Sequence, residues 1–186
     1  MTFKKIITLI LASIILFSLI YFGTSSLLKS LYPLKYEEYV EVYAKENNLE
    51  PAFVYAVIKC ESGFDKNAVS YVGATGLMQI MPDTFKWINS KLGEDKDYSM
   101  ATDPETSVKY GCFLYAYLLS KYGRVQETLA AYHAGNGNVD KWLNNEAYSS
   151  DGKTLHTIPF PSTKKYVKTV MLTQNIYEKL YFRKEQ

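Results

Sequence analysis

The sequence predicts a mainly α-helical domain with one small β element, preceded by a single membrane-spanning helix. Three observations lead to this fold class. Apolar residues recur at helical spacing through most of the chain. Pro and Gly residues stand where helices would begin and end. Only the Gly-rich segment 67–81 lacks this pattern, and its short β-leaning pieces predict a loop with a small hairpin.

The N-terminal segment differs in composition from the rest of the chain. Residues 6–22 are almost wholly apolar, and extension to residue 28 gives about the ~20 residues that span a bilayer. A cleaved signal peptide is the alternative, but the run is long and no clear small-residue cleavage site follows it. Because Lys4 and Lys5 precede the run, we expect a single-pass anchor in the cell membrane with the N-terminus cytoplasmic and the rest extracytoplasmic.

The predicted organisation is therefore an anchor with a short linker at 1–30 and one domain at 31–186. The first expected helix, 35–47, carries an apolar stripe on one face. The next, 50–60, starts with Pro51 near its first position and is apolar nearly all round, which predicts a central buried helix. Ser62 and Gly63 end it.

Helical signals resume after the Gly-rich segment. The expected helix 82–92 begins with Pro82 and is followed by Gly93. The strongest start signal is Asp103, an N-cap acid that precedes a proline and a first-turn glutamate. The later elements are a helix to residue 122, helices at 125–134 and 139–144, a turn-rich loop at 149–161 and a closing helix at 163–182.

Composition narrows the range of functions. The net charge of +2 is close to balanced, so the sequence gives no strong electrostatic case for nucleic acid. The two cysteines, Cys60 and Cys112, lack metal-ligand spacing, and we expect no metal or cofactor. Outside the membrane they could form a disulfide, and they could equally be two buried thiols on packed helices.

Glu61 is the residue that most suggests chemistry. It shares one helix face with Val54 and Ile58, so it continues a buried stripe into the last turn of its helix. Burial raises a carboxyl pKa, and the negative end of the helix dipole acts in the same direction. A carboxyl that stays protonated near neutral pH is what a general acid requires. A solvated Glu61, or one paired with Lys59 or Lys66, is the structural alternative that the residues alone leave open.

Three segments together resemble the SLT-type lytic transglycosylases, which are relatives of goose-type lysozyme. They read ESGFDKNAVSYVGATGLMQIMPDT, AAYHAGNGNV and IPFPSTKKYVKTV, and the resemblance covers roughly residues 36–180. The resemblance implies a lysozyme-like α+β domain with the β element beside an active-site cleft. It also implies cleavage of the β-1,4 bond between N-acetylmuramic acid and N-acetylglucosamine in peptidoglycan, by one glutamate and without a metal.

The resemblance also implies roles for particular residues. The catalytic glutamate of the family falls on Glu61, which would act as general acid and then as base to form a 1,6-anhydromuramyl end. The residues that bind substrate in the family fall on Ser70, Gln79, Met81 and Tyr132. The implied partners are the glycan strands of peptidoglycan.

The chain departs from the family pattern at His133, where Asn is usual, and at Ser162, where Glu is usual. These changes leave the acid in place but motivate a rival, a glycan-binding or assembly protein without turnover. A second rival is a hydrolase of the same bond. It would need another carboxylate, and Asp65 and Asp83 are more simply read as a turn residue and a first-turn helix acid. Tyr166 is a weaker candidate for the sugar groove.

Overall fold

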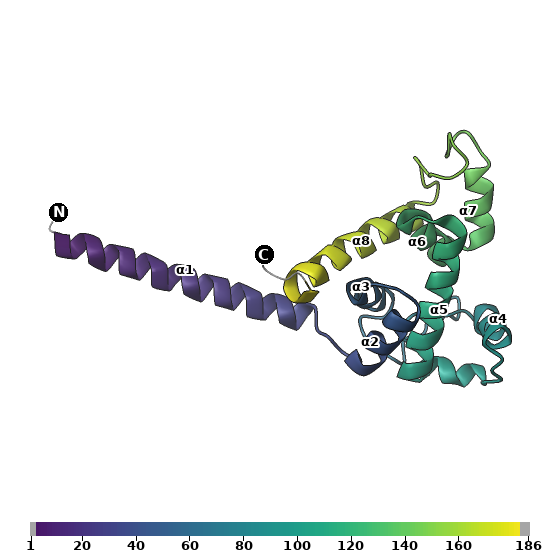
Figure 1. Cartoon of the computed structure of the whole chain (residues 1–186), viewed down its shortest axis with the longest axis horizontal. Coiled ribbons are helices and arrows are strands. Elements are labelled where there is room, and N and C mark those ends of the chain that lie inside the picture. The colour runs from purple at the N-terminus through teal and green to yellow at the C-terminus, as the bar shows by residue number, and fades with distance from the viewer. Residues whose placement is uncertain (1–2, 183–186) are drawn as a thin grey trace. The chain divides into compact units, whose positions relative to one another are not determined.

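The computed structural model describes residues 3–182, in two units divided between Leu34 and Lys35. Residues 1–2 of the predicted anchor segment and residues 183–186 of the predicted domain lie outside the described residues. The first unit is helix α1, Phe3–Leu31, followed by a short extended stretch. The second unit holds the remaining helices (Figure 1).

Helix α1 carries the apolar N-terminal run. Its stretch Ile10–Leu31, 22 residues with a mean hydropathy of 1.9, is long and apolar enough to cross a membrane by length and composition. Large apolar side chains stand exposed along it, among them Phe17 at 71% and Phe22 at 69%. The predicted helix is thus present. A signal sequence passes the same test of length and composition, so the role as an anchor stays a prediction.

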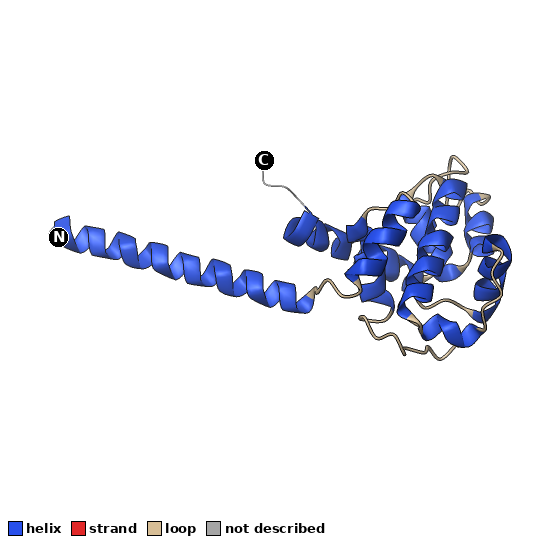
Figure 2. Cartoon of the chain, turned by 60° about the horizontal axis from the view of Figure 1, so that its bottom comes forward, coloured by secondary structure: helices blue, strands red, loops and turns tan. Residues whose placement is uncertain are grey.

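Helix α3 lies in the middle of the second unit (Figure 1). It packs against α2 and α8, and α6 in turn packs against α5, α7 and α8. Figure 2 shows the same unit as helices joined by loops. The bounds are α2 Glu37–Glu46, α3 Pro51–Glu61, α4 Pro82–Leu92, α5 Pro104–Tyr122, α6 Val125–Ala134, α7 Asn136–Leu143 and α8 Pro161–Tyr177.

The burial of α3 follows from its sequence. All seven residues from 52 to 58 are buried, as expected for a helix that is apolar nearly all round. The prediction of a central buried helix is therefore confirmed. The start of α5 is also as predicted, because the Asp103 carboxylate accepts a hydrogen bond from the Thr106 backbone N–H at 2.9 Å.

The β element is smaller than a hairpin. It consists of two isolated antiparallel bridges, Val69 with Thr75 and Thr75 with Ile80, and no strand is present within residues 3–182 (Figure 2). The backbone turns through positive φ at Gly73, Gly76 and Gln79, which prevents a longer ladder from forming. The fold is mainly α, with this irregular loop in place of the expected hairpin.

Several boundaries differ from the sequence-based expectation, most of them by one or two residues. Helix α7 starts at Asn136 instead of 139, and α8 starts at Pro161 because proline suits the first position of a helix. A π-helical segment, Glu178–Phe182, replaces the end of the expected closing helix. A short 3₁₀ helix at Tyr98–Thr102 has no counterpart in the prediction.

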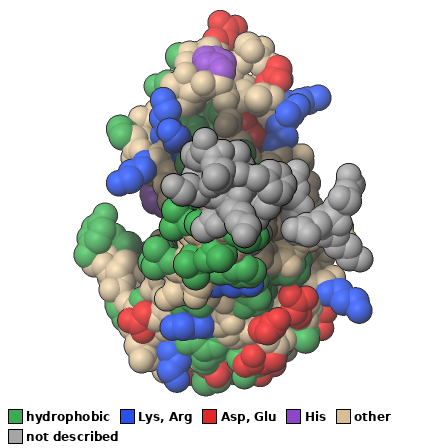
Figure 3. Space-filling view, turned by 90° about the vertical axis from the view of Figure 1, so that its left-hand side faces the viewer, with side chains coloured by type: hydrophobic (Ala, Val, Ile, Leu, Met, Phe, Trp, Pro, Cys, Tyr) green, Lys and Arg blue, Asp and Glu red, His purple; other side chains and the backbone are tan. Residues whose placement is uncertain are grey.

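Charged side chains are mixed on the face of the molecule shown in Figure 3. Lysine and arginine lie interspersed with aspartate and glutamate there, and no continuous basic stripe is visible on that face. This distribution matches a net charge of only +2.

Candidate active site

Glu61 is the last residue of α3, the most deeply buried helix. The chain turns away immediately after it, because Gly63 and Phe64 both adopt positive φ, at 59° and 70°. The Ser62 hydroxyl fixes this turn by accepting a hydrogen bond from the Phe64 N–H at 3.1 Å. The carboxyl is thereby left at the end of the central helix while the backbone leaves in another direction.

Tyr166 of α8 is the hydrogen-bond partner of this acid. Its hydroxyl donates to Glu61 Oε1 at 2.5 Å. Burial raises the pKa of Glu61 to about 7, and the Tyr166 hydrogen bond opposes that shift because it stabilises the anion. Burial is the larger effect, so the carboxyl can both release and take up a proton near neutral pH.

Tyrosines from three helices surround the carboxyl: Tyr115 from α5, Tyr132 from α6 and Tyr166 from α8. Burial raises the pKa of each phenol well above 10, and a charge on Glu61 raises it further. These phenols therefore stay neutral in the range in which Glu61 titrates. The three aromatic rings surround the Glu61 carboxyl with apolar surface, and their hydroxyl groups are the polar groups that they contribute.

Tyr132 lies near Glu61, but its hydroxyl points to a different partner. It donates to the Met78 carbonyl at 2.6 Å, so it joins α6 to the Gly-rich loop. Its ring stacks on Tyr115 with 4.5 Å between the centroids. The direct partner of the acid is thus Tyr166, which the sequence analysis ranked below Tyr132.

The Gly-rich loop lies against the 3₁₀ helix Tyr98–Thr102 and α5 at very short range. A Cβ on Gly76 would stand 1.9 Å from the Ala101 carbonyl oxygen, and one on Gly111 of α5 would stand 2.1 Å from Met78 Sδ. The Met78 N–H also donates to Ser107 Oγ at 3.2 Å. Glycine is therefore required on both sides of this contact, which holds the Met78 carbonyl where Tyr132 binds it.

The other predicted substrate-binding residues belong to the same loop or its end. Ser70 Oγ accepts a hydrogen bond from the Ala74 N–H at 3.0 Å. The Gln79 side-chain amide donates to the Ala68 and Gly76 carbonyls, both at 3.0 Å. Met81 is the N-cap residue of α4 and its side chain is 39% exposed. Ser70 and Gln79 thus shape the loop, and contact of these residues with substrate stays a prediction.

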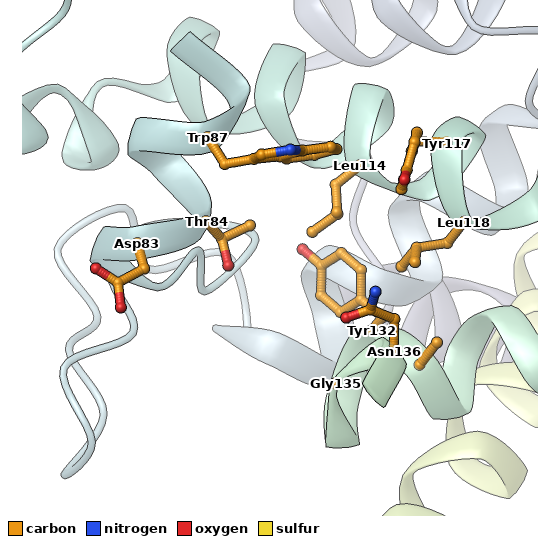
Figure 4. A pocket seen from close by; sticks show the side chains of 10 residues that line it. Asp83, Thr84, Trp87, Leu114, Tyr117, Leu118, Tyr132, Gly135 and Asn136 are labelled. Atoms are coloured by element: carbon orange, nitrogen blue, oxygen red, sulfur yellow. The ribbon is translucent and has the colours of Figure 1, made fainter. Parts of the chain in front are cut away.

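A cavity of about 370 Å³ opens beside Tyr132. Trp87 of α4 and Tyr117 of α5 line one side of it, and Tyr132 and Asn136 line the other (Figure 4). The Trp87 and Tyr117 rings meet edge to face, with 4.8 Å between the centroids. Aromatic walls with a few polar groups are typical of small-molecule and sugar sites.

Of the two residues that depart from the family pattern, His133 packs against Tyr166. The His133 ring is 4.6 Å from the Tyr166 ring, and His133 Nδ1 is hydrogen-bonded to Thr163 Oγ1 at 3.0 Å. Burial lowers the pKa of His133 below its usual 6.5. Ser162 is exposed in the first turn of α8. His133 therefore packs beside the partner of the acid and is not bonded to the acid itself.

The two aspartates considered as a second carboxylate, Asp65 and Asp83, lie in different surroundings. Asp65 Oδ1 accepts from the Asn67 N–H at 2.9 Å, which is a turn contact, whereas Asp83 lines the cavity beside Tyr132.

Both cysteines are free thiols: Cys112 is buried, and Cys60 donates weakly to Thr173 Oγ1 at 3.7 Å. Of the two alternatives for the cysteines, the structure shows unpaired thiols. No group of three or more potential metal-ligating side chains occurs in the part of the chain that the structure describes.

Fold and site together define a class: a helical domain in which a carboxyl at the end of the central helix binds a proton near neutral pH, with an aromatic cavity lined by the nearby Tyr132. The chain belongs to the transglycosylase SLT domain family, whose model matches residues 38–155. The resemblance found in the sequence is thereby confirmed.

Relatives and solved structures agree with this assignment. The soluble lytic murein transglycosylase of Salmonella typhimurium is 32% identical over 163 residues, which cover 85% of this chain and 25% of that protein. Membrane-bound lytic murein transglycosylase C of Actinobacillus pleuropneumoniae is 30% identical, over 62% of this chain and 35% of that protein.

The solved structure of an inactive mutant of lytic transglycosylase Slt from Pseudomonas aeruginosa superposes with a TM-score of 0.73 at 30% identity, covering 82% of this chain and 25% of that one. The 70 kDa soluble lytic transglycosylase of Escherichia coli gives a TM-score of 0.74 at 28% identity, over 84% of this chain and 26% of that one. The chain spans about a quarter of the length of these soluble relatives.

Proposed function

We propose that the chain is a peptidoglycan lytic transglycosylase that cleaves the β-1,4 bond between N-acetylmuramic acid and N-acetylglucosamine. Membership of the SLT family supports this assignment. The observation that carries it is the state of Glu61, whose pKa burial raises to about 7 and whose carboxyl has a hydroxyl donor in Tyr166. Such a carboxyl can serve first as an acid and then as a base.

The proposed mechanism uses Glu61 twice. Its proton passes to the glycosidic oxygen as the bond to the muramyl C1 breaks, and the N-acetyl carbonyl of the substrate stabilises the oxocarbenium-like centre. The Glu61 anion, supported by the Tyr166 hydrogen bond, then accepts the proton of the muramyl O6 hydroxyl. O6 bonds to C1 and closes the 1,6-anhydro ring. Because this nucleophile is part of the substrate, the entropy cost of fixing a water is avoided.

The rival hydrolase differs only in its nucleophile. A two-carboxylate glycosidase needs a second acid across the sugar to activate water or to bond to it. Asp65 is engaged in a turn, which leaves Asp83, on the wall of the cavity beside Tyr132, as the carboxylate to consider. Asp83 is exposed in the first turn of α4, where an acid also suits the helix dipole.

The glycan strand is proposed to run from Glu61 past Tyr132 into the aromatic cavity. Tyr132 supports this path because it lies beside Glu61 and also lines the cavity with Trp87. Ser70, Gln79 and Met81 are proposed to border the same path from the Gly-rich loop. In this arrangement the loop and α6, joined by the Tyr132 hydrogen bond, form one side of the substrate site.

The product of the reaction tests the proposal. The full chain, purified in mild detergent, is incubated with peptidoglycan and the soluble products are weighed by mass spectrometry. We expect muropeptides lighter by one water than their reducing-end counterparts, since ring closure replaces hydrolysis. Reducing-end products would make the protein a hydrolase and direct attention to Asp83. Retained glycan binding without any release would favour the non-catalytic rival.

We also propose that residues 1–30 anchor the protein in the cell membrane, with residues 31–186 on the extracytoplasmic side. The apolar helix α1 supports this proposal, as does the basic pair Lys4 and Lys5 before it. After cell fractionation, the full chain is expected to stay in the membrane pellet through both high-salt and alkaline washes. Release into the soluble fraction, at a mass reduced by the N-terminal segment, would show instead that the segment is a cleaved signal.

A further inference from the structure

Tyr115 contains a buried polar atom that no described residue satisfies. Its side chain is 1% exposed, and its hydroxyl has no hydrogen-bond partner. Among the side chains whose burial the structure describes, only one other buried polar atom lacks a hydrogen-bond partner, the hydroxyl of Tyr55. A buried hydroxyl without a partner destabilises a fold, so each such group calls for a reason.

The ring of Tyr115 is fixed on both sides. Phe53 meets it edge to face with 4.7 Å between the centroids, and Tyr132 stacks on it at 4.5 Å. The hydroxyl therefore has little choice of direction, and it lies beside Tyr166, close enough to Glu61 and Cys60 to respond to their charges. The Tyr115 hydroxyl, which has no hydrogen-bond partner, thus lies beside the hydrogen-bonded pair of Tyr166 and Glu61.

We propose that Tyr115 is a positioning residue whose hydroxyl donates to the Tyr166 oxygen, which in turn donates to Glu61 Oε1. This proposal rests on the proposed role of Glu61 as general acid and base. The Tyr166 oxygen is free to accept, because its own proton is already directed at Glu61. Hydrogen bonds in catalytic sites are often loose without substrate and shorten when substrate binds.

The expected consequence follows from cooperativity between hydrogen bonds. A phenol that accepts a hydrogen bond becomes a stronger donor, by roughly 10–30% per bond in a chain of this kind. Tyr115 would therefore strengthen the Tyr166 bond to the Glu61 anion and hold the Tyr166 hydroxyl in one direction. Because the Tyr166 bond lowers the pKa of Glu61, loss of the Tyr115 hydroxyl should raise that pKa.

Few other groups near Glu61 titrate in the same range. The phenols of Tyr115, Tyr132 and Tyr166 have pKa values well above 10, and burial raises that of the neighbouring Cys60 thiol above 9. Burial lowers the pKa of His133, which packs on Tyr166, below 6.5. A transition near or above pH 7 therefore belongs to Glu61.

The test compares Tyr115→Phe with Tyr55→Phe in the full chain. Each variant removes one unsatisfied buried hydroxyl, and Tyr55 packs elsewhere, against Tyr177 and Phe182. Neither hydroxyl makes a hydrogen bond of ordinary geometry in the free protein, so both variants should keep nearly the thermal stability of the wild type. With soluble glycan strands, Tyr115→Phe should lower kcat about fivefold at an unchanged KM, the loss that corresponds to one ordinary hydrogen bond. Its alkaline activity limb should move up by about 0.3 pH unit, and Tyr55→Phe should leave both quantities as in the wild type.

A readout without turnover separates this inference from the proposed function. The Glu61 carboxyl carbon, labelled with ¹³C and assigned by its loss in Glu61→Gln, is titrated by NMR. We expect a higher midpoint in Tyr115→Phe than in the wild type, and no difference between the two when both also carry Tyr166→Phe. An unmoved midpoint, or an equal shift in Tyr55→Phe, would overturn the role of Tyr115. If the Glu61 midpoint shifts in Tyr115→Phe but the protein cleaves no glycan, the hydrogen-bond chain from Tyr115 through Tyr166 to Glu61 would stand and the proposed reaction would be rejected.

Discussion

Replacement of Glu61 by Gln is expected to lower the rate of peptidoglycan cleavage by about 10²–10⁴-fold, the usual contribution of a general acid–base group. Gln has nearly the same shape and can still accept the Tyr166 hydrogen bond, but it has no proton to give to the glycosidic oxygen. Binding of the glycan should persist. The measurement is the initial rate of anhydromuropeptide release, with binding of both proteins to peptidoglycan determined in parallel.

The role of Glu61 also predicts how activity and stability depend on pH. Glu61 must begin the cycle protonated, and its pKa is raised from 4.5 to about 7, so wild-type activity should fall as the pH rises through about 7. The folded protein also binds this proton more tightly than the unfolded chain between those two values. Ionisation of Glu61 therefore lowers stability as the pH rises through that window. Glu61→Gln should be at least as stable as the wild type at pH 8. A variant that kept more than a tenth of the activity would contradict the role of Glu61.

Gly76→Ala is expected to lower the free energy of unfolding by about 3 kcal/mol, from overpacking and backbone strain together. The new Cβ would stand 1.9 Å from the Ala101 carbonyl oxygen and 2.8 Å from Ser107 Oγ, and φ at this position is +85°. Backbone cannot move aside as a flexible side chain can, so the loop must shift. For a domain of this size the melting temperature should fall by about 10 °C, as measured by thermal unfolding of both proteins.

Gly73→Ala is the matched control for this change. Its φ of +88° imposes the same backbone strain, but nothing lies within 4 Å of the position that its Cβ would occupy. The expected loss is about 1 kcal/mol. Equal losses in the two variants would show that backbone strain alone requires glycine at position 76. The close approach of the loop to Ala101 would then have no energetic role.

Most helices could be predicted because their ends have local chemical causes. The proline at the start of α4, the Asp103 cap of α5 and the glycines after both helices act within a few residues, so a single sequence contains their signal. The short 3₁₀ helix at Tyr98–Thr102 was not predicted although Asp97 caps it, because a single capping residue before so short a segment is a weak signal. The expected hairpin was reduced to bridges since the contacts that hold its loop come from the distant Ser107 and Tyr132.

The candidate site was predictable in part for the same reason. The position of Glu61 follows from the periodicity of one helix, and the family motifs add Tyr132 and the loop. The bond between Tyr166 and Glu61 joins residues 105 positions apart, and no spacing along the chain predicts it. The unsatisfied hydroxyl of Tyr115 was equally hidden, because seventeen tyrosines look alike until the fold decides which are buried near the acid.

The location of Glu61 on the most deeply buried helix has a consequence for how the protein would fail. Segments with few buried contacts open first in a folded protein, whereas central helices stay protected until the whole domain opens. The acid at the end of α3 belongs to the latter kind, and its partner Tyr166 lies on α8, the helix that packs against α3. Fraying at the surface would thus leave the acid intact, and inactivation by heat or denaturant would coincide with cooperative loss of the entire domain.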